Sequence, residues 1–235
     1  MRTLPLRGYD LAPMPPTLPG ERLLRAQMVE AGRRLHARSL ISGGEGNLTA
    51  RLGKELLLCT PTATNKGFLE PRDLVVTDLR GASRGKGRPS SELLLHLACY
   101  QERPDCLAVV HAHPAHAIAL TLSGDALLPC MPETVTGLGP VPTAPYATPG
   151  VPDVAEAVRP FLKDADCVLM ERHGALCMGL GANALLDACD RMEMLEGVAR
   201  VQWLASLRRA PTPLPASEIK ILQAQRAAMR AKPRR

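Results

Sequence analysis

Three histidines follow short apolar segments whose composition is typical of buried strands. His111 and His113 end the segment CLAVVHAH, and His173 follows CVLMER. Side chains two residues apart in an extended chain point to the same side, so the imidazoles of His111 and His113 converge on one point. Three neutral imidazoles that leave one position open are a typical donor set for catalytic zinc, and harder divalent ions can replace it. The pattern predicts a metal site, with a hydrogen-bonded core histidine as the structural alternative at each position.

Glu92, in the segment GRPSSELLLH, is a candidate acid or base for this predicted site. A glutamate in the first turn of a helix also favours the positive end of the helix dipole, which is the structural alternative. Ser90 and Ser91, with the backbone N–H groups that follow them, could equally hold an anion at the start of that helix.

Two further turns, at 43–47 (GGEGN) and 60–64 (TPTAT), are rich in small and hydroxyl-bearing residues. Their backbone N–H groups and hydroxyls suit a phosphate group. Each turn alone is also compatible with an ordinary loop. Three such turns beside a candidate metal site indicate a phosphorylated substrate.

The spacing of apolar residues predicts the elements that would position these side chains. Helical spacing predicts helices, and short apolar runs bounded by turn residues predict strands. Helices are expected at 21–40, 92–101, 113–122, 152–163, 183–207 and from 217, and strands at 48–52, 55–59, 74–78, 106–111 and 167–170. A mixture without strict alternation predicts a single layered domain of the α/β or α+β class.

Composition excludes several classes of protein. With 235 residues, 46% hydrophobic and 22% charged, the chain suits one globular domain. Aromatic residues make up only 3%, too few for the base-stacking surfaces of single-strand nucleic-acid binders. No stretch approaches the roughly 20 apolar residues of a membrane span, and the proline-rich start is unlike a signal peptide. The low aromatic content and the lack of a membrane span mean that neither nucleic acid nor membrane is expected as a partner. Seven scattered cysteines without a CxxC pair predict a reducing, cytoplasmic setting.

The net charge of +6 is concentrated at one end of the chain. Residues 225–235 hold five basic side chains and no acidic one, which leaves about +1 for the rest. We interpret this end as a solvated tail, with a nucleic-acid-binding arm as the alternative.

Six segments in the order GNLTAR, TPTATNKGFL, RPSSE, HAHPAHA, PYATPG and ERHGAL resemble the class II aldolase/adducin family. The resemblance covers residues 21–222 and leaves out a proline-rich N-terminal extension at 1–20 and a basic C-terminal tail at 223–235. It implies an α/β fold, a single three-layer α/β/α domain around a mainly antiparallel central sheet. It also implies a homotetramer with active sites at the subunit interfaces.

The resemblance implies a role for each candidate residue. His111, His113 and His173 match the metal ligands, with Zn²⁺ as the expected ion and Mn²⁺ or Co²⁺ as alternatives. Glu92 matches the catalytic glutamate, and proton shuttling by Glu92 requires a pKa raised toward neutrality. The positions that match the phosphate-binding residues are Gly46, Asn47, Thr62, Ala63, Ser90 and Ser91.

The activity that the resemblance implies is that of a zinc-dependent aldolase, a carbon–carbon lyase. It would cleave a small ketose phosphate by a retro-aldol reaction through a metal-stabilised enediolate. A glutamate follows the two serines, which favours this reaction over a sugar-phosphate 4-epimerase, whose branch usually has aspartate there. A decarboxylase or dehydratase acting on a related acid phosphate is a further alternative. A non-enzymatic adducin-like scaffold is disfavoured, because a scaffold has no need of a metal triad.

Two positions depart from the family pattern. Ala63 stands where a glycine is expected in the second phosphate turn. Met131 falls near the place of a tyrosine that serves as a general acid, which puts a fuculose-type substrate in question. Glu133 could supply a polar group there or be a surface residue. Tyr146, in PYATPG, is interpreted as a structural corner.

Overall fold

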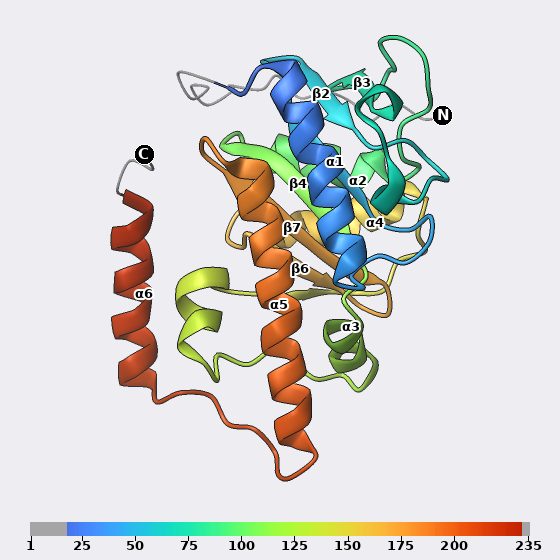
Figure 1. Cartoon of the computed structure of the whole chain (residues 1–235). Helices are drawn as coiled ribbons and strands as arrows, with labels where there is room; N and C mark the ends of the chain where they lie inside the picture. Colours follow the sequence, from blue (N-terminus) through green and yellow to red (C-terminus); the bar gives the residue numbers. More distant parts are fainter. Residues whose placement is uncertain (1–17, 232–235) are drawn as a thin grey trace.

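The computed structural model describes residues 18–231, and one seven-stranded sheet lies at its centre (Figure 1). The strands are β1 (Asn47–Arg51), β2 (Leu56–Cys59), β3 (Val75–Asp78), β4 (Cys106–Ala112), β5 (Thr143–Ala144), β6 (Cys167–Met170) and β7 (Gly174–Leu180). Their order across the sheet is β3-β2-β1-β4-β7-β6-β5, and each neighbouring pair is antiparallel except β5 and β6. The mainly antiparallel sheet implied by the resemblance is confirmed.

Helices cover both faces of this sheet. The longer helices are α1 (Glu21–Ala37), α2 (Leu93–Glu102), α3 (Ala115–Leu122), α4 (Pro152–Val158), α5 (Ala184–Ser206) and α6 (Ala216–Ala231). Buried residues of α1, α3 and α5 form one hydrophobic cluster with one face of the sheet, and α1 and α5 run side by side over it (Figure 1). Buried residues of α2 and α4 form a second cluster with the opposite face. The predicted three-layer α/β/α domain is therefore confirmed.

Residues of β6 alternate between the two clusters. Cys167 and Leu169 belong to the cluster of α1 and α5, whereas Val168 and Met170 belong to that of α2 and α4. A strand buried on both faces is apolar throughout. This is why a short apolar run was sufficient to predict it.

Strand β7 is not among the predicted strands, because Gly174 and Gly179 are typical of turns. The structure shows why a glycine stands inside the strand. A Cβ on Gly179 would lie 1.7 Å from the carbonyl oxygen of Ala184, so the start of α5 could not approach the sheet there. This glycine serves the packing of a helix on a strand rather than a turn.

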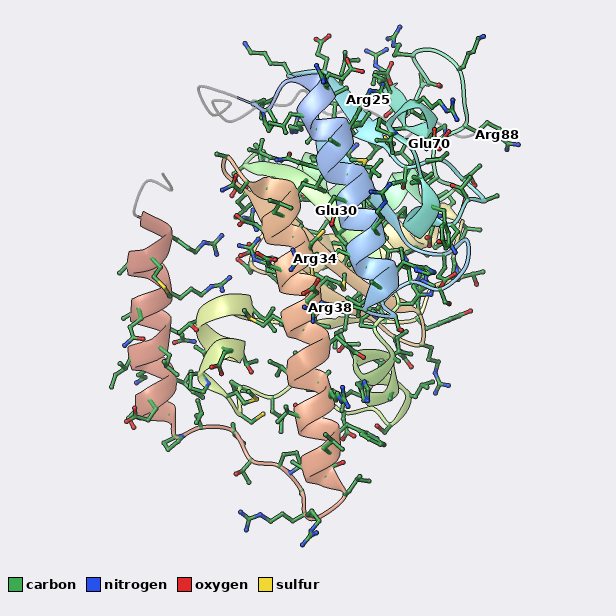
Figure 2. The ribbon with its side chains drawn as sticks, viewed as in Figure 1. Arg25, Glu30, Arg34, Arg38, Glu70 and Arg88 are labelled. Atoms are coloured by element: carbon green, nitrogen blue, oxygen red, sulfur yellow. The ribbon has the colours of Figure 1, made fainter. Side chains whose placement is uncertain are left out.

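Helix α1 ends at Ala37, three residues before the predicted end, and its end shapes the site. Ser39 has a φ of 57°, the left-handed conformation that commonly terminates helices. The backbone N–H of Leu40 then donates to the carbonyl of Leu35 at 2.9 Å, and Leu40 and Ile41 turn into the core. Ion pairs also tie this end of α1 to α5, because Arg34 pairs with Asp190 and Nε of Arg38 lies 3.0 Å from Glu193. Figure 2 labels Arg34 and Arg38 at this end of α1.

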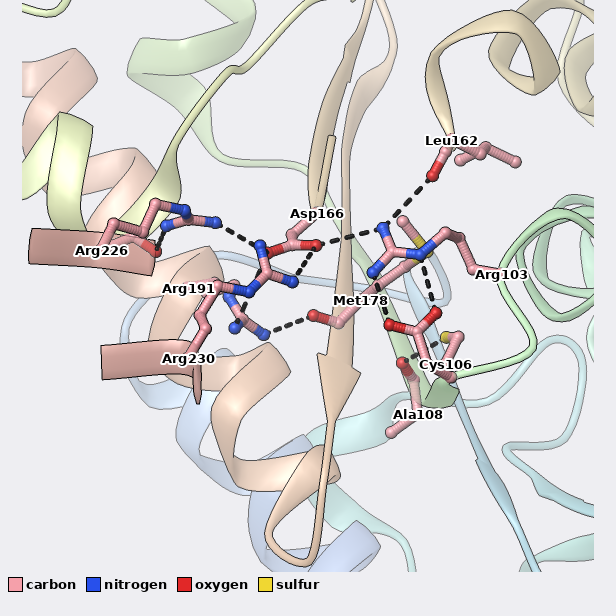
Figure 3. Close-up of polar contacts among 11 residues, drawn as sticks. Arg103, Cys106, Ala108, Leu162, Asp166, Met178, Arg191, Arg226 and Arg230 are labelled. Carbon is pink, nitrogen blue, oxygen red and sulfur yellow. Dashed lines mark hydrogen bonds and ion pairs between the residues drawn. The ribbon is translucent and has the colours of Figure 1, made fainter. Parts of the chain in front are cut away.

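A buried cluster of charged side chains holds α6 against the domain (Figure 3). Asp166, just before β6, is 2% exposed and accepts hydrogen bonds from Arg226 at 2.7 Å and from Arg103 and Arg230 at 3.2 Å. Nη2 of Arg191 lies 3.9 Å from the same carboxylate. One carboxylate therefore faces four guanidinium groups, two from α6, one from α5 and one from the loop that follows α2.

The interpretation of the C-terminal end as a solvated tail is wrong for Arg226 and Arg230, which pair with the buried Asp166. Arg226 also donates to the backbone carbonyls of Thr136 and Gly137, at 3.0 and 2.6 Å. The predicted boundary between residues 222 and 223 falls inside α6. The last basic residues, at 232–235, lie outside the described range, as does most of the expected proline-rich extension, residues 1–17.

Short helical turns complete the chain. They are η1 (Lys66–Phe68), η2 (Pro71–Asp73), η3 (Thr134–Leu138, a π-helix) and η4 (Arg159–Phe161). Helix α4 gives way to η4 at Arg159, because Pro160 cannot donate a backbone hydrogen bond within a helix. Within residues 18–231, none of the helices combines the length and the hydropathy that crossing a bilayer requires.

Candidate active site

The three predicted histidines converge on one point in the structure. Ligand atoms of His111, His113 and His173 all lie within 4.8 Å of one another. Nδ1 of His111 donates to the backbone carbonyl of Ala175 at 2.9 Å, which leaves a lone pair on its Nε2. Burial lowers the pKa of His113 to about 4, so this imidazole is neutral at neutral pH. Neutral imidazoles are the form that binds a metal ion.

Neighbouring strands bring these side chains together. His111 lies near the end of β4 and His113 just beyond it, where its backbone N–H donates to the carbonyl of Leu40 at 2.8 Å. His173 lies in the turn between β6 and β7, after Arg172, whose φ of 57° marks a tight left-handed turn. Because β4 and β7 are adjacent, the end of one meets the beginning of the other.

The donor set fits a divalent metal ion. Nε2 of His111 and Nε2 of His113 lie 3.2 Å apart. Two nitrogens of a tetrahedral zinc site are separated by roughly 3.3 Å. Nδ1 of His173 is buried without a hydrogen-bond partner among residues 18–231, whereas a structural histidine usually has one. These observations favour a metal site over the core-histidine alternative.

Glu92 lies against two of these imidazoles. Its Oε2 is 3.4 Å from Nε2 of His111, and its Oε1 is 3.2 Å from Nε2 of His173. Oε2 also accepts a hydrogen bond from Nδ2 of Asn47 at 2.9 Å. The carboxylate is therefore placed at the edge of the histidine cluster, within reach of a molecule bound there.

The pKa of Glu92 is shifted in the direction opposite to the expectation for a shuttling acid. Burial favours the neutral form, but the nearby imidazoles of His111 and His173 and the hydrogen bond from Asn47 outweigh it and hold the pKa of Glu92 below its usual range. The expected rise toward neutrality is therefore wrong for this arrangement. An ionised Glu92 has to accept a proton before it can donate one.

Two of the predicted phosphate turns are joined by backbone hydrogen bonds. The N–H of Thr62 donates to the carbonyl of Arg88 at 3.0 Å, and the N–H of Ser90 donates to the carbonyl of Thr60 at 3.2 Å. These two N–H groups already donate within the protein, so they are not free to bind a phosphate group. The side chain of Ser90 accepts from the N–H of Glu92, the N-cap residue of α2, at 3.2 Å, and no side chain of the described residues caps this helix.

The first turn, residues 43–47, lies against the second. A Cβ on Gly44 would be 3.9 Å from Cα of Ala63, and Nδ2 of Asn65 donates to the carbonyl of Ser42 at 3.0 Å. Ala63 has a φ of 53°, in the left-handed region that favours glycine. This conformation explains why a glycine is expected at this position. All three turns therefore meet beside Glu92.

A comparison with protein families matches residues 26–203 to the model of the class II aldolase and adducin N-terminal domain. The chain belongs to the class II aldolase and adducin family. The resemblance inferred from the six motifs is confirmed, and so is the fold that it implied.

Several members of the class II aldolase and adducin family are similar to this chain over most of their length. The 3-oxo-tetronate 4-phosphate decarboxylase of Haemophilus influenzae is 35% identical over 74% of this chain and 84% of its own. The L-fuculose phosphate aldolase of Methanocaldococcus jannaschii is 31% identical over 77% of this chain and 96% of its own. The crystal structure of YgbL from Klebsiella pneumoniae superposes with a TM-score of 0.81 at 33% identity, covering 87% of this chain and 99% of that one.

The six predicted phosphate-binding residues differ in where they lie and in what they contact. Thr62, Ala63, Ser90 and Ser91 lie on the two joined turns. Gly46 is buried with a φ of 68°, and a Cβ there would lie 2.5 Å from a methyl group of Ile41. Asn47 directs both amide atoms away from the turns, to Glu92 and to His96. Its side chain therefore belongs with Glu92 rather than with the phosphate turns.

Lys66 is a candidate phosphate-binding residue that the sequence reasoning missed. Its side chain is almost fully buried, and its ammonium donates to the carbonyl of Gly44 at 2.5 Å, beside the first two turns. Burial lowers the pKa of Lys66, although Glu45 and Glu92 oppose that effect. The available signal was its position two residues after the TPTAT turn.

The structure places the remaining candidates away from hydrogen-bonding contact with the histidines. Met131 and Glu133 precede η3, which packs against α5 and α6, and Glu133 is exposed. Tyr146 is 54% exposed, and its backbone N–H donates to Glu171 at 3.2 Å. Its interpretation as a structural corner agrees with this contact.

Proposed function

We propose that this protein catalyses the metal-dependent decarboxylation of 3-oxo-tetronate 4-phosphate or a close analogue. Two relatives with that activity in their names, from Haemophilus influenzae and Pectobacterium atrosepticum, are 35% and 33% identical to this chain. The observation that carries the choice is the contact of a single carboxylate, Glu92, with the histidines, together with a methionine where a tyrosine acid is expected.

The number of proton transfers distinguishes the two candidate reactions. In decarboxylation the C1–C2 bond breaks, CO₂ leaves, and the electron pair stays on the substrate as an enediolate. One proton delivered to C2 then gives dihydroxyacetone phosphate. Retro-aldol cleavage forms the same enediolate, but it must also remove a hydroxyl proton from the departing aldehyde. Glu92 alone suffices for the first reaction, whereas the second is better served by two groups.

The chain's own residues have separable tasks in this reaction. His111, His113 and His173 would hold the divalent ion, for which we propose Zn²⁺, and such an ion supplies Lewis-acid polarisation of the substrate's ketone oxygen. Glu92, which faces the cluster, takes a proton from water and delivers it to C2. The hydroxyls of Thr62 and Ser91 and the ammonium of Lys66 would hold the phosphate, so that the scissile bond lies beside Glu92.

The decisive experiment supplies purified protein and Zn²⁺ with 3-oxo-tetronate 4-phosphate, and measures CO₂ and dihydroxyacetone phosphate. We expect both products in equal amounts, and a Glu92→Gln variant slower by at least about a hundredfold. A preparation that binds zinc yet releases no CO₂ contradicts the proposed decarboxylation. The His111→Ala, His113→Ala double variant is the control, because it should lose both bound metal and activity.

Retro-aldol cleavage of a ketose 1-phosphate is the second candidate. It is supported by the L-fuculose phosphate aldolase that matches this chain over 96% of its own length. The same preparation, assayed with ketose 1-phosphates, separates the candidates because aldolase activity releases an aldehyde and no CO₂. Epimerase activity would convert ribulose 5-phosphate without releasing either.

The role of Lys66 can be tested separately. Replacing Lys66 with methionine should raise KM for the phosphorylated substrate by about tenfold or more, because a buried cation beside the phosphate turns is lost. Lys54→Met is the matched control, since Lys54 is exposed on the β1–β2 hairpin. Equal KM values for the two variants would remove Lys66 from the phosphate site.

We also propose that the protein forms the homotetramer of the family resemblance. Exposed apolar side chains gather near the C-terminal end of α5, and a subunit interface would bury them. They are Val201, Trp203, Leu204 and Leu207. Light scattering of the full chain should give four times the monomer mass of 25.3 kDa, and a monomer would contradict this assembly.

A further inference from the structure

Polar residues on β1 and α2 face one another at matching intervals. Asn47, Thr49 and Arg51 alternate along β1, so they share one face of the strand. Glu92, immediately before α2, is followed by polar residues at positions 96 and 100. Residues four apart on a helix are separated by about 6 Å along its axis. Residues two apart on a strand are separated by about 6.7 Å. Because these two spacings are similar, the three polar residues of β1 can alternate in space with the three polar residues at positions 92, 96 and 100.

The interleaved side chains form a continuous chain of hydrogen bonds. Nδ2 of Asn47 donates to Glu92 at 2.9 Å, and Oδ1 of Asn47 lies 2.5 Å from Nε2 of His96. Nδ1 of His96 lies 2.8 Å from Oγ1 of Thr49, which lies 2.9 Å from the hydroxyl of Tyr100. The four residues that follow Glu92 in this chain are each at most 3% exposed.

The chemistry of the groups determines the direction of each bond. A carboxylate only accepts, so the Asn47 amide presents Nδ2 to Glu92 and its oxygen to His96. His96 must then carry its proton on Nε2. Burial lowers the pKa of His96 to about 3, so the ring is neutral and Nδ1 accepts from the hydroxyl of Thr49. Tyr100 in turn donates to Thr49. Each member, His96 included, therefore donates to the next group toward Glu92.

The two oxygens of Glu92 have different surroundings as a result. Oε2 accepts from Asn47, at the end of the buried chain. Oε1 is buried with no hydrogen-bond partner among residues 18–231, and lies 3.2 Å from Nε2 of His173. The chain thus restrains one oxygen and leaves the lone pairs of the other directed at the histidine cluster.

We propose that Asn47, His96, Thr49 and Tyr100 are positioning residues that hold Glu92 through Oε2 and reserve Oε1 for proton transfer. The proposal rests on the proposed role of Glu92, and it adds a structural device that reaches from the site to the far end of α2. None of the three residues beyond Asn47 touches the substrate site. Their effect on the reaction is exerted through the orientation of the carboxylate.

A threonine-to-valine pair tests the proposal. Thr49→Val removes the hydroxyl that links His96 to Tyr100 while preserving the shape of the side chain. Thr77→Val on β3 is the matched control. Thr77 is also fully buried in the sheet, and its hydroxyl bonds to Cys59 at 3.3 Å, away from Glu92. Both variants lose one buried hydroxyl, so a loss that follows from stability alone should be similar in the two.

We expect Thr49→Val to lower kcat by about tenfold with little change in KM, because the carboxylate is misplaced while substrate binding is retained. Thr49→Ser, which keeps the hydroxyl, should recover most of the loss. Thr77→Val should keep the wild-type kcat, and all three variants should bind metal as the wild type does. Equal kcat values for Thr49→Val and Thr77→Val overturn the proposal. An inactive wild type instead contradicts the proposed function.

A second measurement does not depend on activity. The ¹⁵N and ¹H resonances of the His96 ring should report a neutral imidazole protonated on Nε2 throughout the range from about pH 5 to pH 8. A ring protonated on Nδ1, or a charged ring in this range, would reverse the order of donors and overturn the proposal. The resonance is assigned with a His96→Gln variant.

Discussion

Gly174 lies directly against the imidazole of His111. A Cβ on Gly174 would come 3.0 Å from Cε1 of that ring, 2.9 Å from Cδ2 of His113 and 2.5 Å from the carbonyl oxygen of Ala112. The first residue of β7 therefore has to be glycine for two of the three imidazoles to occupy their positions. The need is steric, since no positive φ is involved at this position.

Replacing Gly174 with alanine should weaken metal binding and also destabilise the fold, because the added methyl group meets the backbone carbonyl of Ala112 as well as two imidazole rings. The added methyl group pushes both rings away from the common point, and we expect zinc affinity to fall by about 10–100-fold. Isothermal titration of the zinc-depleted protein measures this. Gly197→Ala on α5 is the control, because a Cβ there meets nothing within 4 Å. Wild-type zinc affinity in Gly174→Ala would show that the rings can move without cost.

Replacing Ala63 with glycine should stabilise the protein. The φ of 53° at Ala63 places an ordinary side chain in the left-handed region, which costs an L-residue about 1–2 kcal/mol. We expect Ala63→Gly to raise the free energy of unfolding by about 1 kcal/mol, measured by urea denaturation. Ala26→Gly on the exposed face of α1 should have the opposite sign and cost about 1 kcal/mol. A destabilised Ala63→Gly variant would indicate that the methyl group makes contacts worth more than the strain.

The histidine cluster could be predicted from the sequence because each histidine lies near the end of a buried strand or just beyond it. The apolar runs before His111 and His173 indicate strands, and strand ends in one sheet lie close together. The hydrogen-bonded chain behind Glu92 also has a signal, although the sequence reasoning did not use it. That signal is the pair of spacings N-x-T on β1 and E-x₃-H-x₃-Y on α2, which becomes meaningful only when the strand and the helix are known to pack together.

Other features depend on contacts between distant segments that no local pattern indicates. Arg226 resembles a residue of a solvated basic tail until Asp166, 60 residues earlier, is seen to be buried beneath it. Lys66 is an ordinary surface residue by composition, and only the packing of α1 over η1 buries it. The glycines of β7 indicate a turn locally, whereas the helix and rings packed against them require a strand without side chains there.

Glu45 should make stability depend on acid pH. Burial opposes its ionisation, but hydrogen bonds from the backbone and hydroxyl of Ser42 and from the N–H of Gly43 outweigh this and lower the pKa of Glu45 to about 2. Its contribution is therefore complete above the unfolded-state pKa of about 4.5 and is lost as the pH falls toward 2. We expect Glu45→Gln to be less stable than the wild type near neutral pH, and the difference to shrink below about pH 4. Urea denaturation across this range measures it, and a pH-independent difference would contradict the linkage.

Asp166 should be essential for holding α6 on the domain. Asp166→Asn leaves four guanidinium groups, three of them largely buried, facing one another without the carboxylate they share. Removing one partner of a buried ion pair costs about 3–5 kcal/mol. We expect the loss to appear in two ways: a lower free energy of unfolding, and faster trypsin cleavage within α6 than within α5. The exposed neighbour Asp164 supplies the control, since Asp164→Asn removes the same charge two residues away and should change neither quantity. Lower stability with α6 still protected would mean that the helix is held by its contacts with η3, and that Asp166 serves only to neutralise the arginines.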